Sequence, residues 1–429
     1  MSISDNIRLF PKHSLVGEID IAPDKSISHR AVMCGALANG KTVIKNFLLG
    51  QDCLSTIDCF RKLGVKIEIE NSTVTVFGSG FNLKKPKEVL NVSNSGTTLR
   101  LLTGILSGCG FESEIDGDES IRKRPMSRVT EPLSLMGAKF EFINQNFCPV
   151  KIFGNTLTGI NYNLTVPSAQ VKSAIIFAGL RASSKTVLAE LQSTRDHTER
   201  MLKAFGAGLK ISGKNIEITP VKDLKATSLI VPGDISSAAF LIAAALITEN
   251  SKIKIKNVGV NPTRSLIIDV FKKMGGDIVL ENYKDGLEPV CDIIVKSSKL
   301  KGITINREIP LIIDEIPIIA SIASQCEGTT VIENLQELKF KESNRLDTIF
   351  NELKTCGVDI TKTASGLIIK GKNKIKGSNF KSYNDHRIAM MCAILSLVAY
   401  NESSIENYRC VDISFPGFFE ILQKIGIYK

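Results

Sequence analysis

The 429-residue chain has no tryptophan, only 6% aromatic residues and four histidines. Proteins that bind single-stranded nucleic acids stack bases on aromatic side chains and cluster their basic residues. Here the aromatics are scarce and the lysines are spread along the whole chain, so a basic RNA-binding repeat protein is only a remote alternative. The net charge of +10 then leaves ordinary solubility or an anionic substrate as explanations.

Long apolar runs and paired cysteines are also missing. No stretch approaches the roughly 18 to 20 uncharged apolar residues that a membrane helix needs. The N-terminus lacks the basic region and apolar run of a secretory signal. The ten cysteines form no C-x-x-C pair, which argues against a zinc site and against a disulfide framework. We therefore expect buried free thiols in a cytoplasmic protein with no membrane contact.

What the chain does have is a sixfold internal repeat. Six times an amphipathic helical pattern ends in a glycine and an alternating strand follows, with spacings between 69 and 82 residues. The six glycines are Gly64, Gly137, Gly206, Gly275, Gly357 and Gly426. A glycine at this point can supply the left-handed residue that closes a helix. Six such endings at near-regular spacing indicate a repeated structural unit.

Each repeat contains a second, different helix. These helices are rich in small and apolar residues on all sides, as in residues 28–38 and 236–246, which predicts that they are buried. The predicted unit is a buried helix, a strand, an amphipathic helix and two strands, in an α/β fold. The last unit lacks its final hairpin, and residues 7–22 supply strands with no preceding helix. We expect this N-terminal segment to complete the sixth unit, giving one domain of residues 23–233 and another of residues 1–22 with 234–429.

Unusual polar residues gather where the buried helices begin. They include Asp24-Lys25-Ser26, Asn94-Ser95-Gly96-Thr97, Pro167-Ser168-Ala169-Gln170, Gly233-Asp234, Asp314-Glu315 and Asn384-Asp385-His386-Arg387. Taken singly, Ser95, Ser168 and Asp234 are most simply helix caps. Six helix starts in two threefold domains can also point into one cleft, where their N–H groups and dipoles would bind anions.

Capping does not explain the cations at these helix starts. Lysine and arginine near a helix N-terminus oppose its dipole and cost stability unless an anion is held there. The cations in question are Lys25, Arg30, Arg100, Arg124 and Arg387. A further cluster, Lys341, Glu342 and Arg345, stands at another predicted helix start. Because arginine suits bidentate contact with phosphate or carboxylate, the pattern predicts a site for strongly anionic small molecules.

Eight runs of residues resemble the motifs of the 5-enolpyruvylshikimate-3-phosphate synthase family. They are residues 24–30 (DKSISHR), 94–100 (NSGTTLR), 124–126 (RPM), 166–174 (VPSAQVKSA), 195–199 (RDHTE), 232–238 (PGDISSA), 341–345 (KESNR) and 385–390 (DHRIAM). The match is collinear from about residue 12 to about residue 425. The resemblance implies an inside-out α/β barrel of two domains, each with three βαβαββ units, which close over substrates in the interdomain cleft.

The resemblance also implies a reaction and a set of site residues. The enolpyruvyl group of phosphoenolpyruvate would pass to the 5-hydroxyl of shikimate 3-phosphate through a tetrahedral intermediate, without a metal or cofactor, in a monomeric enzyme of the glyphosate-target family. Shikimate 3-phosphate would contact Lys25, Ser26, Arg30, Ser168, Ala169, Gln170, Arg195, Asp314 and Lys341. Phosphoenolpyruvate would contact Lys25, Gly96, Arg124, Gln170, Arg345 and Arg387. Asn94, Thr97, Asp385 and His386 would support the site. Asp314 resembles the base, and Glu342 with Lys25 resembles the acid.

The sequence departs from the family pattern at a few positions. Ser93 stands where glycine is usual, Asn344 where aspartate is usual, Ala169 where some members have serine, and Ile413 where many carry a lysine that contacts phosphoenolpyruvate. The sister enzyme, UDP-N-acetylglucosamine enolpyruvyl transferase, is the nearest alternative. It typically has a cysteine in the loop before the arginine that corresponds to Arg124, and residues 117–123 contain none.

Overall fold

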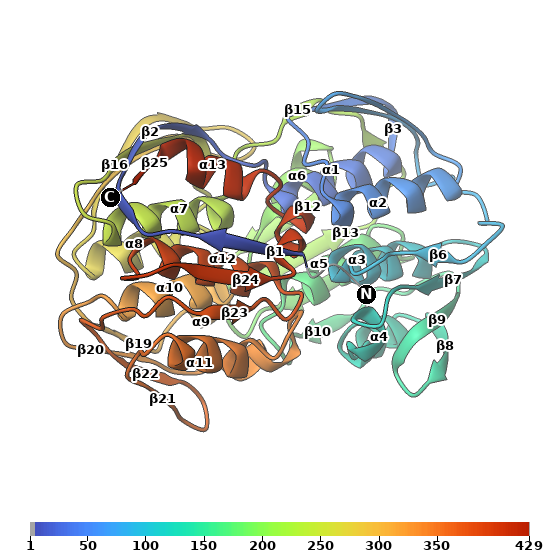
Figure 1. Ribbon diagram of the computed structural model, residues 1–429. Helices are drawn as coiled ribbons and strands as arrows, with labels where there is room; N and C mark the ends of the chain where they lie inside the picture. The colour runs from blue at the N-terminus through green and yellow to red at the C-terminus, as the bar shows by residue number, and fades with distance from the viewer. Residues whose placement is uncertain (1–4, 429) are drawn as a thin grey trace. The chain divides into compact units, whose positions relative to one another are not determined.

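The computed structural model describes residues 5–428 and divides into two compact units. One is the Pro23–Val231 unit. The other is the Pro232–Lys429 unit, which also includes the N-terminal segment up to Ala22. The chain is a mixed α/β protein, as predicted (Figure 1). Among residues 5–428, each unit contains three sheets and three buried helices.

Two kinds of helix alternate along the chain. The buried helices are α1 (Lys25–Leu37), α3 (Gly96–Ser107), α5 (Ala169–Gly179), α7 (Ile235–Ile247), α10 (Ile316–Ala323) and α12 (His386–Leu397). The amphipathic helices are α2 (Gln51–Lys62), α4 (Ser127–Leu135), α6 (His197–Ala204), α8 (Leu266–Lys273), α11 (Arg345–Thr355) and α13 (Phe418–Ile425). Short turns of helix are α9 (Ile309–Ile312), η1 (Ile121–Lys123), η2 (Gln336–Phe340) and η3 (Tyr408–Ile413). All twelve residues of α12 are buried, as its all-round apolar pattern predicts.

The Pro23–Val231 unit contains three sheets. One contains β14 (Leu224–Lys225), β3 (Ala38–Lys45), β5 (Thr73–Ser79) and β4 (Lys66–Glu70) in that order, with β15 (Leu229–Ile230) also beside β3. The next contains β6 (Leu90–Asn91), β7 (Glu112–Asp116), β9 (Phe147–Phe153) and β8 (Lys139–Asn144). The third contains β10 (Asn161–Asn163), β11 (Thr186–Ala189), β13 (Asn215–Thr219) and β12 (Gly208–Ser212). In each sheet an antiparallel set is flanked at one edge by parallel pairing: β10 beside β11, β6 beside β7, and both β14 and β15 beside β3.

The Pro232–Lys429 unit repeats this arrangement. Its first sheet contains β17 (Asp277–Lys284), β18 (Val290–Lys296), β16 (Lys252–Gly259), β2 (Lys12–Asp20) and β25 (Gly426–Tyr428). Its second contains β19 (Thr304–Ile305), β20 (Thr329–Ile332), β22 (Leu367–Lys370) and β21 (Ile360–Lys362). Its third contains β1 (Asn6–Leu9), β24 (Ser403–Glu406) and β23 (Asn379–Lys381).

The N-terminal segment serves two sheets of this unit. Strand β1 pairs antiparallel with β24, and the first half of β2 pairs antiparallel with β25 at the other end of the chain. The second half of β2, from Val16 to Asp20, pairs parallel with β16. One extended segment therefore supplies both the missing strand of the sixth repeat and the parallel strand of the fourth.

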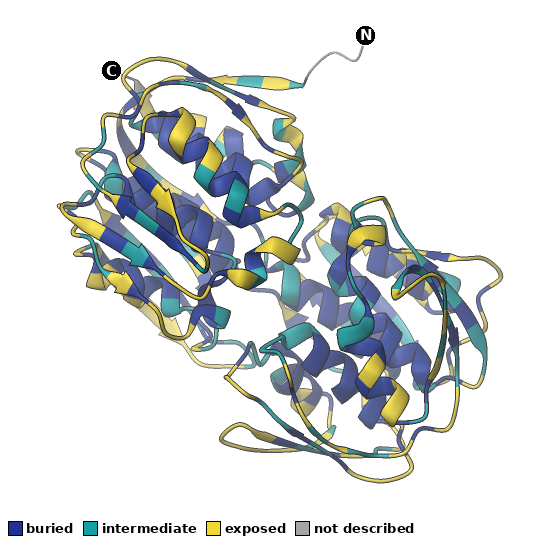
Figure 2. Cartoon of the chain, turned by 90° about the horizontal axis from the view of Figure 1, so that it is seen from below, coloured by how far each residue is buried: buried dark blue, intermediate teal, exposed yellow. Residues whose placement is uncertain are grey.

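The core of each unit is formed by its buried helices. Helix α3 packs on α5 and on α1, while α7, α10 and α12 pack on one another. Figure 2 shows these helices as mostly buried and the strands with more exposed residues. Close packing depends on small residues: a Cβ on Gly104 of α3 would lie 2.2 Å from the Ala174 carbonyl oxygen of α5. Two helix backbones can meet this closely only where a side chain is absent.

The predicted glycine endings hold for five of the six repeats. Gly64, Gly137, Gly206, Gly275 and Gly357 all have positive φ values, between 83° and 102°. The prediction is wrong for Gly426, whose φ is −85°. There α13 passes directly into β25, which pairs with β2, so the chain needs no left-handed turn.

Candidate active site

Five of the six buried helices begin with a side-chain cap at the predicted residue. The oxygen of each capping side chain accepts a hydrogen bond from a backbone N–H two or three positions on; the caps are Asp24, Ser95, Ser168, Asp234 and Asp385. The fifth repeat differs, because Asp314 and Glu315 lie between the short helix α9 and α10, and Glu315 makes no cap bond. Capping therefore accounts for these side chains but leaves the neighbouring cations to be explained.

Helix α1 presents Lys25, Ser26 and Arg30. The Lys25 ammonium lies 3.0 Å from the Asp52 carboxylate in the first turn of α2. Arg30 is buried and donates from Nε to the Thr198 hydroxyl at 2.6 Å and from Nη1 to the Ser26 carbonyl at 3.0 Å. Burial lowers the pKa of Arg30 to about 10. Such a guanidinium gains stability from an anion placed beside it.

Arg124, which directly follows η1, lies against the start of α3 and has N–H groups without hydrogen-bond partners in the described part of the chain. Nε and Nη2 of Arg124 are buried and have no hydrogen-bond partner among residues 5–428. A Cβ on Gly96, in the first turn of α3, would lie 2.7 Å from Nη1 of the same arginine. Buried donors without partners are costly, so this position favours a bound anion beside Gly96. Asn94 is half-buried immediately before the Ser95 cap.

Gln170, in the first turn of α5, forms hydrogen bonds with the first turns of α3. Its amide Nε2 donates to the Thr97 hydroxyl at 3.0 Å, and its Oε1 accepts a short hydrogen bond from Arg100. Ser168 caps this helix and Ala169 is its first residue. Arg195 is half-buried just before α6, and its positive charge contributes to the lowered pKa of Arg30 after burial itself. The Pro23–Val231 unit thus brings Arg30 and Arg195 together, and likewise Gly96, Thr97, Arg124 and Gln170.

In the Pro232–Lys429 unit a second cluster is built around Asp314. Its Oδ1 accepts from Lys341 Nζ at 3.0 Å and from Arg345 Nη1 at 3.2 Å. Arg387 of α12 donates from Nη1 to the Asp314 backbone carbonyl at 2.8 Å. Arg345 is the first residue of α11 and Lys341 directly follows η2, so cations from these two places meet at the Asp314 carboxylate, while Arg387 of α12 binds the backbone of the same residue.

Arg345 is held by two further carboxylates. Its Nη2 lies 2.6 Å from Glu342 Oε2, and its Nε and Nη2 contact Asp385 at 2.8 and 3.1 Å. Burial alone would lower the pKa of Arg345, but the surrounding carboxylates, Asp385 first, raise it. Burial likewise opposes ionisation of Asp385, yet the Arg345 guanidinium outweighs it and lowers the pKa of that carboxyl. This buried bidentate pair orients Arg345.

A buried polar chain approaches Arg387 from the fourth repeat. Glu315 is fully buried, lies 3.5 Å from Arg387 Nη1, and accepts a short hydrogen bond from Ser236. Ser236 in turn accepts from Arg264 at 2.6 Å. His386 is buried beside Arg387 in the first turn of α12.

Several partners of the predicted residues were not identified from the sequence. Asp52 pairs with Lys25 over 27 positions, and Thr198 with Arg30 over 168. The one local signal was an acidic residue in the first turn of α2, at Asp52. Thr198 gives no such signal, because a threonine hydroxyl in a helix has no pattern that reveals its partner.

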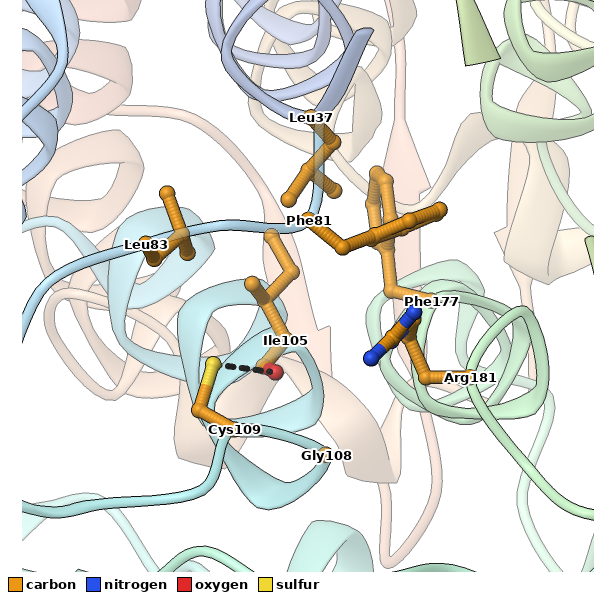
Figure 3. A pocket seen from close by; sticks show the side chains of 8 residues that line it. All are labelled: Leu37, Phe81, Leu83, Ile105, Gly108, Cys109, Phe177 and Arg181. Atoms are coloured by element: carbon orange, nitrogen blue, oxygen red, sulfur yellow. Dashed lines mark hydrogen bonds between the residues drawn. The ribbon is translucent and has the colours of Figure 1, made fainter. Parts of the chain in front are cut away.

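One small pocket lies at the opposite ends of the buried helices. Figure 3 shows it lined by Leu37 at the end of α1, by Ile105, Gly108 and Cys109 around the end of α3, and by Phe81, Leu83, Phe177 and Arg181. Its free space of about 10 Å³ is about enough for one water molecule. The candidate site residues are at the helix starts, so this pocket is not part of their site.

The described part of the chain shows neither a metal site nor a membrane-spanning helix. Within residues 5–428 no three His, Cys, Asp or Glu side chains are grouped so that they could hold a metal ion. Within the same residues no helix is long and apolar enough to span a bilayer.

Known proteins resemble this chain over nearly its full length. The family model "EPSP synthase (3-phosphoshikimate 1-carboxyvinyltransferase)" matches residues 10–422. The 3-phosphoshikimate 1-carboxyvinyltransferase of Thermoanaerobacter sp. (strain X514) is 52% identical over 417 residues, covering 97% of this chain and 99% of the relative. That of Bacillus subtilis (strain 168) is 51% identical over 418 residues, covering 96% and 98%.

Solved structures agree with these relatives. The EPSP synthase structure from Acinetobacter baumannii superposes with a TM-score of 0.88 at 42% identity, covering 99% of this chain and 98% of that one. Neither the sister transferase nor an RNA-binding protein is favoured by these matches. The chain belongs to the EPSP synthase family and is an enzyme that transfers an enolpyruvyl group in the shikimate pathway.

Proposed function

We propose that the chain joins phosphoenolpyruvate to the 5-hydroxyl of shikimate 3-phosphate, with Lys25, Asp314 and Glu342 as its catalytic residues. The observation that carries this assignment is the Asp314 cluster. There a carboxylate lies within 3.2 Å of two cations, Lys341 and Arg345, and a second carboxylate, Glu342, lies on the same arginine. General acid–base chemistry needs two such groups in one place.

The proposed reaction proceeds in two balanced steps. Asp314 takes the proton of the attacking hydroxyl while its oxygen bonds to C2 of phosphoenolpyruvate. Glu342 with Lys25 delivers a proton to the methylene carbon, which gives the tetrahedral intermediate. Glu342 with Lys25 then takes a proton back from the new methyl group, and Asp314 gives its proton to the departing phosphate, which restores the double bond. Each catalytic group thereby returns to its starting protonation state.

We propose one set of contact residues for each of the two anionic substrates. Shikimate 3-phosphate contacts Lys25, Ser26, Arg30, Ser168, Ala169, Gln170, Arg195, Asp314 and Lys341. Phosphoenolpyruvate contacts Lys25, Gly96, Arg124, Gln170, Arg345 and Arg387. The unused buried donors of Arg124 support its role, because an anionic ligand would satisfy them.

The test is phosphate release from phosphoenolpyruvate with either shikimate 3-phosphate or UDP-N-acetylglucosamine as acceptor. We expect release with the first acceptor alone. Lys25→Ala and Asp314→Ala should each lower turnover by about 10²- to 10⁴-fold with folding intact. Lys185→Ala, which removes an exposed ion pair with Glu217, is the control and should keep full turnover. Near-normal turnover of either active-site variant would remove that residue from the mechanism.

We also propose a monomer of the cytoplasm. All ten cysteines are free thiols and nine are buried, which suits a reducing compartment. Burial raises the pKa of Cys34 to about 12, so this thiol is chemically inert. Light scattering of the purified protein should give a single mass near 46.8 kDa, and twice that mass would refute the monomer.

A further inference from the structure

A largely buried charge cluster in the Pro23–Val231 unit has no role in the proposed reaction. Lys172 of α5 has no exposed surface, and its Nζ lies 2.7 Å from Glu199 Oε1 and 3.1 Å from Glu190 Oε1. The same nitrogen donates to the Thr194 carbonyl at 3.3 Å. An ammonium group has three N–H donors, and here three acceptors meet them. All three acceptors belong to one stretch, residues 190–199.

This stretch carries Arg195. Residues 190–196, between β11 and α6, form no helix or strand. Glu190 Oε1 accepts from the Thr194 amide at 3.1 Å and from its hydroxyl at 2.6 Å. Lys172 holds the Thr194 carbonyl, so both backbone polar groups of the residue before Arg195 are held. The path of the chain into Arg195 therefore depends on the buried cluster.

The far end of the stretch orients Arg30. Thr198 accepts from Arg30 Nε at 2.6 Å, and its hydroxyl lies 2.6 Å from that of Ser173. Ser173 also accepts from Arg30 Nη2 at 3.0 Å. Lys172 and Ser173 are adjacent in α5. One turn of this helix therefore contacts both the segment that leads into Arg195 and the hydroxyl groups that bind Arg30.

The charge balance of the cluster also points to the arginines. Two carboxylates face a single ammonium, and burial raises the pKa of Glu199. After burial itself, the negative charge of Glu199 is the largest influence on Arg30, and it raises the pKa of that guanidinium. Removing charges from water is costly, and apolar residues of similar size often serve stability equally well. A buried cluster of three charges is better explained by the orientation that it imposes on its neighbours.

We propose that Lys172, Glu190 and Glu199 are positioning residues, which hold Arg195 and Arg30 in the orientation that binds shikimate 3-phosphate. The inference rests on the proposed function, since it assumes that these two arginines contact that substrate. The three residues act through the arginines and touch no substrate themselves.

The first experiment compares binding of the two substrates. Glu190→Gln keeps the side-chain shape but removes the charge, and Lys172→Met removes the ammonium. We expect the Kd of shikimate 3-phosphate, measured by titration calorimetry, to rise about tenfold or more, as is typical of outer-shell partners. The KM of phosphoenolpyruvate should change by less than about twofold. Glu217→Gln, at the exposed ion pair with Lys185, is the matched control and should change neither value.

A double-mutant cycle separates positioning from general destabilisation. If Glu190 acts through Arg195, then Glu190→Gln should raise the Kd of shikimate 3-phosphate only slightly further in a protein that already carries Arg195→Ala. Additive losses, or an unchanged Kd in the folded Glu190→Gln variant, would overturn the inference. Should Lys172→Met fail to fold, the Glu190→Gln cycle still decides the matter. If the wild-type protein does not bind shikimate 3-phosphate at all, the proposed function fails instead.

Discussion

Among single residues, Ser93 carries a backbone conformation that its side chain disfavours. Its φ is 51°, in the left-handed region, where a residue other than glycine costs about 1–2 kcal/mol. The turn lets the Ser93 carbonyl accept from the Asp118 amide at 2.8 Å, two residues before the Ser95 cap of α3. The glycine that is usual here in the family is thus explained by geometry.

Ser93→Gly should leave stability unchanged or raise the free energy of unfolding by up to about 1 kcal/mol. Relief of the strain is partly offset by the greater freedom of glycine in the unfolded chain. Ser93→Val should lower it by more than about 1 kcal/mol, because a β-branched residue tolerates this region poorly. Denaturant unfolding of both variants measures the difference, and equal midpoints for Gly and Val would contradict the explanation.

The Asp385–Arg345 pair makes stability depend on pH. Asp385→Asn keeps an N-cap residue on α12 but removes the charge that faces a buried guanidinium, so we expect a loss of about 3 kcal/mol at neutral pH. The pKa of Asp385 is lowered in the folded state, so its contribution is fully present above its unfolded pKa of about 3.9. It is lost as the pH falls through the lower folded pKa.

Melting temperatures of the wild type and Asp385→Asn, measured from pH 7 downward, test whether the stabilisation by Asp385 is lost as the pH falls. The gap between them should stay constant above about pH 5 and narrow in acid. A gap that widens in acid would show that Asp385 is not stabilised as a carboxylate.

At the scale of helices, the approach of α3 to α5 depends on Gly104. Both helices begin at candidate site residues, Gly96 in one and Ala169 and Gln170 in the other, so their separation affects the site directly. The Gln170–Thr97 hydrogen bond and the Arg100–Gln170 contact link the same two helix starts.

Gly104→Ala should destabilise the protein by about 1–3 kcal/mol, because its Cβ would meet the Ala174 backbone. We also expect weaker substrate binding as the helices separate. Gly110→Ala is the control, since no atom lies within 4 Å of its new Cβ. Thermal unfolding of the two variants is the measurement, and equal losses would argue against close helix packing as the cause.

At the scale of the whole molecule, each unit is completed by strands from a distant part of the chain. Strands β14 and β15 return to pair with β3, and the N-terminal segment pairs with β24, β25 and β16. Because β2 lies between β16 and β25 in its sheet, the Pro232–Lys429 unit depends on residues at the other end of the chain.

Removal of residues 1–22 should therefore destabilise the Pro232–Lys429 unit selectively. Sheets that lose interior or partner strands expose unpaired N–H and C=O groups. Hydrogen exchange should show faster exchange in β16, β24 and α12, while the helices of the Pro23–Val231 unit serve as the internal control. Equal loss of protection in both units would refute this division.

The repeated units and the starts of their helices could be predicted from local patterns of residues. Buried helices such as α12, the caps and five of the six glycine endings follow from local patterns, because neighbouring residues in a helix or turn interact within a few positions. The cations at the helix starts were likewise visible, since they conflict with the helix dipole wherever the helix lies.

Which side chains form ion pairs and hydrogen bonds with one another could be seen only in the tertiary structure. The Lys25–Asp52 and Arg30–Thr198 contacts, the Arg345–Asp385 pair and the Lys172 cluster join residues that are 18 to 168 positions apart. The division of the N-terminal segment between two sheets, which allows Gly426 to be extended, is of the same kind. Such contacts depend on how helices and sheets approach one another, and no local periodicity encodes that approach.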